Sequence, residues 1–364
     1  MLAQRKKVYP HPSSSTRNAT PQLKPVFSSG LIARMHKTKK FPSFAVVAAV
    51  ALVGASVSSC SSESQSDNAA DIIATTNVWA DVAAAVTGSE VAAIISDASI
   101  DPHHFEPAAK DLARVKAANL VVANGGHYDQ AIYRVAEQDR VIFAVPPHAH
   151  DEHDHDHEHD HGHGHDHDHE GHDHEGHDHE HGWIDTIPES MDELEHVWFA
   201  TSKVKDVATQ VADRTGGSAD DVVARMDAIQ QRLDSFKHVH LAMTEPIAAP
   251  LIWGTELHDI TPESYLLATL NEVEPSASAV AETLALIESG FLDFLVVNPQ
   301  STNSATDRLA QAAKDNNLPI VEIRETPPEG MNFLDYFEQV VDEIEAIVDA
   351  AEPRPDTELP RFNN

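Results

Sequence analysis

Residues 218–236 read SADDVVARMDAIQQRLDSF, and this stretch decides how the rest of the chain is organised. Ser218, with two aspartates close behind it, is typical of a helix start. Apolar residues then recur at helical spacing, and the stretch contains neither Gly nor Pro. The pattern predicts one long helix between an N-terminal and a C-terminal half of the chain.

Short apolar runs alternate with amphipathic segments on both sides of this helix. Before it they occupy residues 72–76, 91–96, 120–124 and 141–145. After it they occupy residues 239–243, 291–298 and 319–323, followed by an amphipathic helix at 332–350. Alternating strands and helices are typical of parallel sheets covered by helices. We therefore predict an α/β fold with two Rossmann-like lobes. The expected boundaries are 72–217 for the N-terminal lobe, 218–238 for the linking helix, 239–352 for the C-terminal lobe and 353–364 for a tail.

The composition restricts the kinds of partner. The 364 residues include 25 Lys and Arg against 59 Asp and Glu, which gives a formal net charge of −34. An acidic protein repels nucleic acid and anionic lipid, so we expect no nucleic-acid partner, whereas a cation is favoured. Cys60 is the only cysteine, which excludes disulfide scaffolds and cysteine metal centres. Any metal site must therefore use nitrogen and oxygen ligands.

The N-terminal region reads as an export signal. Residues 35–59 contain the basic stretch MHKTKK, an apolar stretch shorter than the roughly 20 residues of a spanning helix, and small residues before Cys60. The ending resembles a bacterial lipobox, which makes Cys60 the expected lipid-attachment residue; the alternative is a signal peptide with an incidental cysteine. Residues 1–34 show no apolar periodicity, so they are either a disordered leader or an upstream segment if translation starts at Met35. Residues 60–71 read as a tether.

A His-rich tract interrupts the N-terminal lobe. Residues 148–182 contain 16 His and 13 Asp or Glu, punctuated by Gly. Such a segment has no apolar face to bury, so we predict a disordered loop that binds metal without fixed geometry. The letters HEHDH at 157–161 match the zinc-protease pattern H-E-x-x-H. In a tract made of His and acids this match arises by chance, and the helix that the motif requires is absent.

Four residues outside the tract could form a defined site: His103, His196, Glu245 and Glu325. Three of them follow predicted strands, and in open α/β sheets ligands bind beyond the carboxyl ends of the strands. Two lobes that face each other would bring the four together in a cleft. Two imidazoles and two carboxylates suit a divalent cation.

These residues resemble those of a known family, the metal-binding solute receptors of zinc and manganese ABC importers, over about residues 72–348. DPHHFEP at 101–107 is similar to the family motif D-P-H-x-Y/F-E-P, which implies that His103 is the first ligand. EHVW at 195–198 is similar to the motif E/P-H-x-W after the His-rich insert, which implies that His196 is the second. Glu245 and Glu325 stand where the family places its remaining ligands.

Two departures from the family pattern are visible. The second motif often begins Asp-Pro-His, but this chain has Leu194 and Glu195 before the histidine. His127 stands in a segment where the family has no histidine, and we interpret it as a loop residue rather than an additional ligand.

The resemblance implies two lobes bridged by one rigid helix, with a metal cleft between them. It also implies a receptor and not an enzyme: a monomer held by a lipid anchor at the outer face of the cytoplasmic membrane, which delivers its cargo to an ABC permease with a cytoplasmic ATPase. Two carboxylates suit Mn²⁺, but the His-rich tract favours Zn²⁺. The alternatives are a manganese receptor, and an adhesin or zinc-storage lipoprotein. A zinc hydrolase would need an open coordination position and a general base.

Overall fold

The computed structural model describes residues 71–147, 184 and 186–359. The predictions for the signal segment, for Cys60 and for the tract at 148–182 lie outside these residues. In the part of the chain that is described, no helix is both long and apolar enough to cross a membrane.

The N-terminal half forms a parallel sheet of four strands. They are β1 (Ile72–Thr76), β2 (Ala92–Ile95), β3 (Leu120–Ala123) and β4 (Val141–Phe143), in the order β2-β1-β3-β4. All three pairings are parallel. Strand β3 is buried along its whole length, which explains why its sequence LVVA is apolar throughout. The helices of this half are α1 (Asn77–Thr87), α2 (Ala109–Ala117) and α3 (Gln130–Tyr133).

The C-terminal half repeats the arrangement. Its strands are β5 (Val239–Met243), β6 (Leu257–Asp259), β7 (Phe294–Val297) and β8 (Ile320–Glu322), all parallel and in the order β6-β5-β7-β8. Its helices are α6 (Ala249–Ile252), α7 (Glu263–Leu270), α8 (Ala277–Glu288) and α9 (Ser304–Asp315). The prediction of two α/β lobes with parallel sheets is confirmed.

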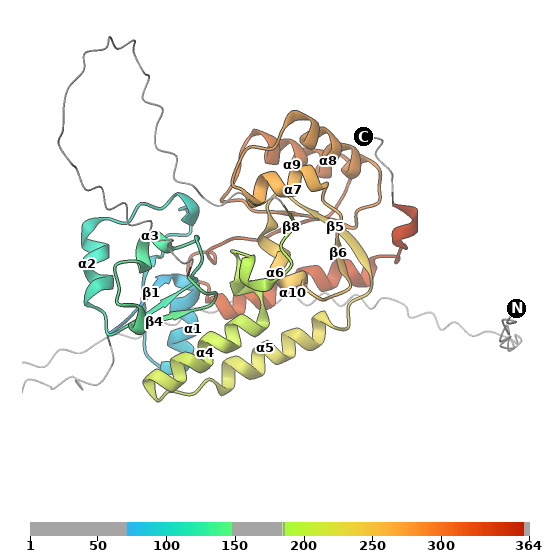
Figure 1. The fold of residues 1–364 in the computed structure, drawn as a ribbon. Coiled ribbons are helices and arrows are strands. Elements are labelled where there is room, and N and C mark those ends of the chain that lie inside the picture. The colour runs from blue at the N-terminus through green and yellow to red at the C-terminus, as the bar shows by residue number, and fades with distance from the viewer. Residues whose placement is uncertain (1–70, 148–183, 185, 360–364) are drawn as a thin grey trace, which may run out of the picture. The chain divides into compact units, whose positions relative to one another are not determined.

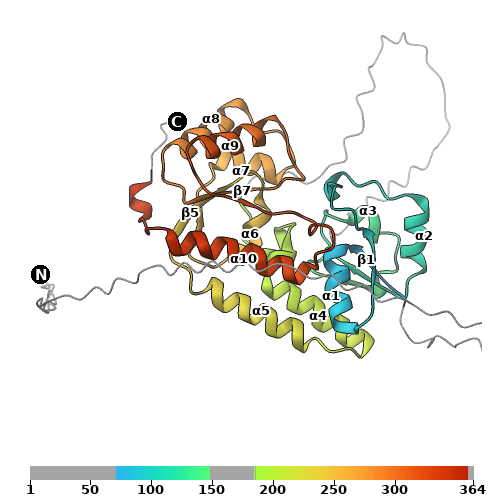
Figure 2. The same cartoon turned by 180° about the vertical axis from the view of Figure 1, so that it is seen from behind.

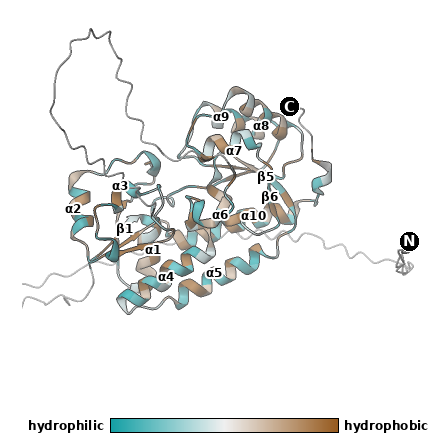
Figure 3. Cartoon of the chain, viewed as in Figure 1, coloured by the Kyte–Doolittle hydropathy of each residue, from teal (hydrophilic) through white to brown (hydrophobic). Residues whose placement is uncertain are grey.

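Three longer helices complete the two lobes: α4 (Thr201–Thr215), α5 (Asp220–Leu233) and α10 (Phe333–Ala350). Both views in Figures 1 and 2 show α5 and α10 running alongside each other. Figure 3 shows α4 and α5 banded in hydrophilic and hydrophobic colours, as expected of amphipathic helices that bury one face. The helix predicted at 218–236 is α5, and the one predicted at 332–350 is α10, which the structure shows to contact both halves as well.

The turn between α4 and α5 is fixed by two glycines. Gly216 ends α4 with φ of 76°, a left-handed conformation that glycine adopts without steric cost. At Gly217 a Cβ atom would lie 2.3 Å from the carbonyl oxygen of Val86, at the end of α1. The turn therefore packs directly against α1, which brings α5 onto the N-terminal lobe.

The largest apolar core cluster of the described residues runs from the first sheet to the second, and each half has a further cluster of its own. Val82 of α1, Met226 of α5, Val239 of β5 and Val340 of α10 are all at most 1% exposed within it. Two arginines on α5 also bind α10: Arg225 contacts Asp335 and Glu338, and Arg232, two turns later, contacts Asp342 and Glu345. These pairs are partly exposed, so each contributes only about 0–1 kcal/mol, but they fix the register of the two helices.

Short 3-10 helices lie in the loops: η1 (Pro102–His104), η2 (Gln138–Arg140), η3 (Met191–Glu193), η4 (Val197–Phe199), η5 (Pro246–Ala248) and η6 (Asp356–Glu358). Three of them stand next to the residues that the sequence predicts as ligands. In both sheets the strand order changes side at the first strand. Strands β2 and β3 lie on opposite sides of β1, and β6 and β7 lie on opposite sides of β5. Such a switch point opens a crevice at the carboxyl ends of the strands.

Candidate metal centre

The four predicted ligands lie in four separate loops. His103 is the middle residue of η1 in the loop after β2, and His196 immediately precedes η4. Glu245 follows β5, and Glu325 follows β8. The two histidines therefore come from the N-terminal half of the chain and the two glutamates from the C-terminal half.

Hydrogen bonds to the local backbone orient the side chains of the two histidines. Asp101 accepts a hydrogen bond from the backbone N–H of His103 at 3.0 Å, and Pro102 begins η1, so the start of the turn is fixed. The next residue, His104, points away: its side chain is 82% exposed and contacts Asp101. His196 is held in place by Asn124, which directly follows β3. The side-chain amide of Asn124 donates to the carbonyl oxygen of Glu195 at 2.8 Å.

The four side chains meet with one potential ligand atom each, and these atoms all lie within 4.8 Å of one another. The Nε2 atoms of His103 and His196 are 3.2 Å apart. Glu245 Oε1 lies 3.2 Å from His196 Nε2, and Glu325 Oε2 lies 3.5 Å from His103 Nε2. Tetrahedral zinc with bonds of 2.0–2.1 Å places its ligand atoms about 3.3 Å apart, so these spacings fit such an ion. We call these four residues the cleft cluster.

Two buried side chains orient the carboxylates. Asn298, which follows β7 and is 1% exposed, donates from its amide nitrogen to Glu245 Oε2 and to Glu325 Oε1, both at 2.9 Å. The other oxygen of each glutamate is thereby turned towards the histidines. The hydroxyl of Tyr128 donates to Glu325 Oε2 at 2.8 Å. Partners of this kind hold ligands in place and strengthen metal binding.

A third glutamate, Glu272, orients the imidazole ring of His103. Glu272 Oε1 lies 3.0 Å from His103 Nδ1, and a carboxylate at this nitrogen keeps the proton there. Nε2 is the nitrogen that must lose its proton to a metal, and it is the atom that faces the other proposed ligands. Glu272 has φ of 54°, which is rare for a residue with a side chain and costs of order 1–3 kcal/mol. This strained residue crosses from the C-terminal half to reach a histidine of the N-terminal half.

Charge is tightly coupled within the cleft cluster. Burial alone would lower the pKa of His103, but the charge on Glu325 and the hydrogen bonds to Glu245 and Glu272 outweigh it and hold the pKa well above its usual value. Burial would also lower the pKa of His196, yet Glu245 raises it. Burial opposes the ionisation of Glu245, but its bonds to the two imidazoles keep its pKa far below the usual range. Without a cation, the imidazoles therefore hold protons that a metal must displace.

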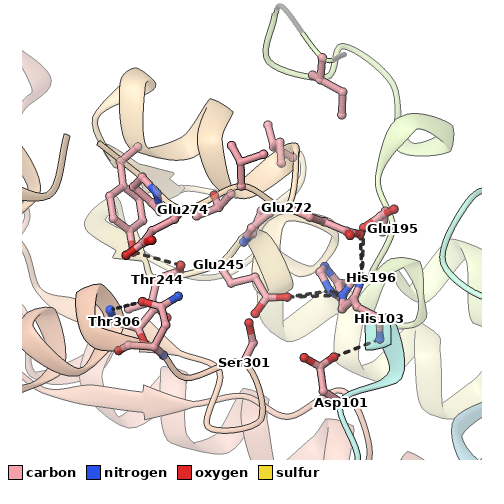
Figure 4. A pocket seen from close by; sticks show the side chains of 18 of the residues that line it. Asp101, His103, Glu195, His196, Thr244, Glu245, Glu272, Glu274, Ser301 and Thr306 are labelled. Carbon is pink, nitrogen blue, oxygen red and sulfur yellow. Dashed lines mark hydrogen bonds and ion pairs between the residues drawn. The ribbon is translucent and has the colours of Figure 1, made fainter. Parts of the chain in front are cut away.

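A cavity of about 320 Å³ borders His103, His196 and Glu245. Figure 4 shows Glu245 pointing across it towards the two imidazoles, with Glu195 and Glu272 beside them. Its wall is acidic, with carboxylates from Asp101, Glu193, Glu195, Glu272 and Glu274. A cavity lined by one sign of charge concentrates ions of the opposite sign, so this one attracts cations.

Three residues that shape this site are not predicted from the sequence. Asn298 directly follows a predicted strand, so the strand-end rule that selected Glu245 could have selected it too. Tyr128 and Glu272 lie in loops, and no motif in the sequence marks them. His127 belongs to none of the groups of potential metal ligands found in the described part of the chain.

The sequence of the chain matches one family model. The model describes the zinc-uptake complex component A, periplasmic (ZnuA), and it matches residues 72–347. A comparison with curated proteins finds no match.

The fold is similar to those of several solved structures. A mutant of the laminin-binding adhesin (Lmb) from Streptococcus agalactiae has a TM-score of 0.51 and 13% identity, over 76% of this chain and 98% of that one. ZnuA has a TM-score of 0.50 and 14% identity, over 76% and 97%. The SBP FpvC from Pseudomonas aeruginosa, in complex with Mn²⁺, has a TM-score of 0.50 and 12% identity, over 77% and 98%. At these identities the likeness concerns the fold.

Proposed function

The chain belongs to the family of the periplasmic zinc-uptake complex component A, and on this premise we propose that it captures Zn²⁺ outside the cytoplasm and delivers it to an ABC permease. The family consists of metal-binding solute receptors of ABC importers, and such receptors are not enzymes. Zn²⁺ is thus the cargo of the protein. His103, His196, Glu245 and Glu325 are the proposed ligands.

The observation that carries this proposal is the convergence of the cleft cluster. Two imidazoles from one half of the chain and two carboxylates from the other have ligand atoms within 4.8 Å of one another. Asn298 bonds to both carboxylates, which fits two groups that share one cation. An ion bound here would join the halves, so a small change in their packing would release it.

Manganese is the second candidate cargo, and the pair of carboxylates favours it because oxygen ligands suit Mn²⁺. Three points favour zinc: a nitrogen-containing site binds Zn²⁺ more tightly than Mn²⁺ as a rule, the spacings fit a tetrahedral ion, and the tract at 148–182 is rich in imidazole. An adhesin or a storage lipoprotein would also bind metal at this site, but would not need a permease.

Zinc titrations and growth assays together test the function. We expect one tight equivalent of Zn²⁺ and much weaker binding of Mn²⁺ in a competition titration. Cells that lack this chain should grow poorly at low zinc, and the wild type, but not His196→Ala, should restore growth. Restoration by the variant would exclude cargo capture at the cleft cluster. Tighter binding of Mn²⁺ would replace the proposed cargo by the alternative.

The proposed lipid anchor is tested separately. Two acyl chains hold a protein stably at a membrane, whereas an acidic body without them is repelled by anionic lipid. Cys60→Ala should therefore move the protein from the membrane fraction to the soluble fraction. A variant that stays with the membrane would rule out acylation at Cys60, without bearing on zinc capture.

A further inference from the structure

Three histidines and one aspartate meet at the start of the second sheet, away from the cleft cluster. They are His238, His240, His258 and Asp356, and one potential ligand atom from each lies within 4.8 Å of the others. His240 of β5 pairs in register with His258 of β6. His238, two residues earlier, faces the same side as His240 because side chains alternate along a strand. Asp356 reaches them from η6 in the C-terminal tail. We call this group the tail cluster.

One oxygen atom stands at the centre of the tail cluster. Asp356 Oδ1 lies 2.9 Å from His240 Nε2, 2.9 Å from His258 Nδ1 and 3.0 Å from His238 Nε2. The Nε2 atoms of His238 and His240 are 3.3 Å apart. A carboxylate oxygen has two lone pairs, so it cannot accept well from three N–H groups at once. Hydrogen bonding alone therefore does not account for this convergence.

The burial of His240 is a second indication that hydrogen bonding alone does not satisfy this cluster. Its side chain is fully buried, and no group among the described residues bonds to its Nδ1 atom. Buried polar groups normally have hydrogen-bond partners, and an imidazole in a buried strand costs free energy without them. The polar contacts of the His240 ring are those at Nε2, within the tail cluster. Metal coordination at Nε2 would compensate for the burial.

The tail is held in position by groups outside the cluster. Arg354 binds Asp293 Oδ1 at 2.9 Å and lies over the ring of Phe291. Asp293 in turn accepts from the backbone N–H of His240 at 2.8 Å, and its own N–H donates to the carbonyl of His240. These contacts place Asp356 beside the strand before any ion arrives, which reduces the entropy that binding must overcome.

We propose that the tail cluster is a second Zn²⁺ site, with His238, His240, His258 and Asp356 as its four ligands. The spacings of 2.9–3.3 Å are close to the roughly 3.3 Å between ligand atoms around tetrahedral zinc, so small side-chain shifts suffice. Three imidazoles favour Zn²⁺ over Mn²⁺. The side chains of His258 and Asp356 are 42% and 53% exposed, so an ion can enter from solvent.

The proposed site differs in purpose from the cleft cluster. All of its ligands come from the C-terminal half, and it lies at the opposite end of β5, roughly 16 Å along the strand from Glu245. An ion here would fasten the tail to β5 and β6. The proposal does not depend on the cargo function, because an ion at this end of the sheet has no part in capture at the cleft.

Hydrogen exchange measured with and without Zn²⁺ tests the site on the full chain. An ion bound to Asp356 should slow amide exchange at residues 356–359 by about 100-fold at a Zn²⁺ concentration 100 times the dissociation constant. The effect should be lost in Asp356→Asn and in His258→Ala. Both residues are exposed enough that the fold should tolerate these changes, which the thermal unfolding of the metal-free protein will check. Glu352→Gln is the matched control, since Glu352 is an exposed acid of the same tail outside the cluster.

The variants also separate this site from the others that bind zinc. His196→Ala should lose the tight equivalent yet keep the protection of the tail, whereas Asp356→Asn should do the reverse. If Zn²⁺ leaves exchange in the tail of the wild type unchanged, the site does not exist. If protection persists in both Asp356→Asn and His258→Ala, zinc acts from another position, and the assignment is equally wrong.

Discussion

The cleft cluster and the tail cluster use the same kinds of side chain in opposite settings. The cleft cluster takes ligands from both halves of the chain, buries them, and surrounds them with Asn298, Tyr128 and Glu272. The tail cluster takes its ligands from one half, at the start of two strands, and leaves two of them open to solvent. The first arrangement suits an ion that is held tightly and released by a movement. The second suits an ion that fastens one segment to a sheet.

The two clusters differ mainly in the groups that position their proposed ligands. In the cleft cluster each glutamate has one oxygen bonded to Asn298, so the direction of the other is determined before a cation binds. In the tail cluster the position of Asp356 is set by the side chain of Arg354, two residues earlier, which binds Asp293. We therefore expect the two clusters to respond differently to mutation, to pH and to deletion of the tract.

The largest effect should come from removing a ligand of the cleft cluster. His103→Ala should weaken the tight zinc equivalent by more than the roughly 10- to 100-fold that loss of an outer partner costs. His104→Ala is the matched control, because this neighbouring imidazole is exposed and points away. Competition with a chelator of known affinity measures both. Equal losses in the two variants would mean that the wrong histidine of the pair has been assigned.

Lowering the pH should also affect the cleft cluster strongly. The pKa values of His103 and His196 are raised in the metal-free protein, and each imidazole must lose its proton before it binds. Affinity should therefore rise with pH, by about tenfold per pH unit for each proton displaced, and should continue to rise above pH 6.5. Zinc titrations across a pH series measure the slope. A plateau that begins near pH 6.5 would contradict the raised values.

Removing the outer partner should have an intermediate effect. Asn298→Leu keeps the size of the side chain but removes both hydrogen bonds to the glutamates, so we expect a loss of about 10- to 100-fold in zinc affinity. Protection of the tail by zinc should not change, which makes the tail cluster an internal control in the same sample. Unchanged affinity in a variant whose metal-free unfolding temperature matches the wild type would mean that Asn298 does not position the ligands.

The smallest effect on the cleft cluster should come from deleting residues 148–182. Alternating His and acids offer several weak sites, so those equivalents should vanish, while the tight equivalent of the cleft cluster and the equivalent of the tail cluster remain. Zinc should still stabilise the fold by about 2.7 kcal/mol at 100 times the dissociation constant, measured as a shift of the unfolding temperature. If the deletion removes the tight equivalent and the shift together, the tract and not the cleft is the receptor site.

The fold was largely readable from the sequence, because fully buried strands leave apolar runs. Strand β6 was missed, since Leu-His-Asp at 257–259 has one apolar residue and the strand is only three residues long. The four proposed ligands of the cleft cluster are predicted by motif and by position after strands, and the structure brings their side chains together. Glu272 could not be predicted, because its role depends on a loop that crosses between the halves.

The sequence contains part of the pattern that predicts the tail cluster. His238 and His240 alternate at the start of a predicted strand, which places both on one face. What the sequence could not supply was Asp356, which is 98 residues from His258 and lies in a tail without apolar periodicity. Only the folded chain brings such distant residues to one point.

The packing of α1 against α10 also has a consequence for the order in which the chain can fold. Asp81 on α1 caps the start of α10 by accepting from the N–H of Phe333, a contact between residues 252 apart. The last long helix thus covers the first one, and the N-terminal lobe lacks part of its cover until the C-terminal end of the chain has been made. Contacts this distant in sequence form slowly. The chain is therefore expected to remain incompletely folded until its C-terminal residues have been synthesised.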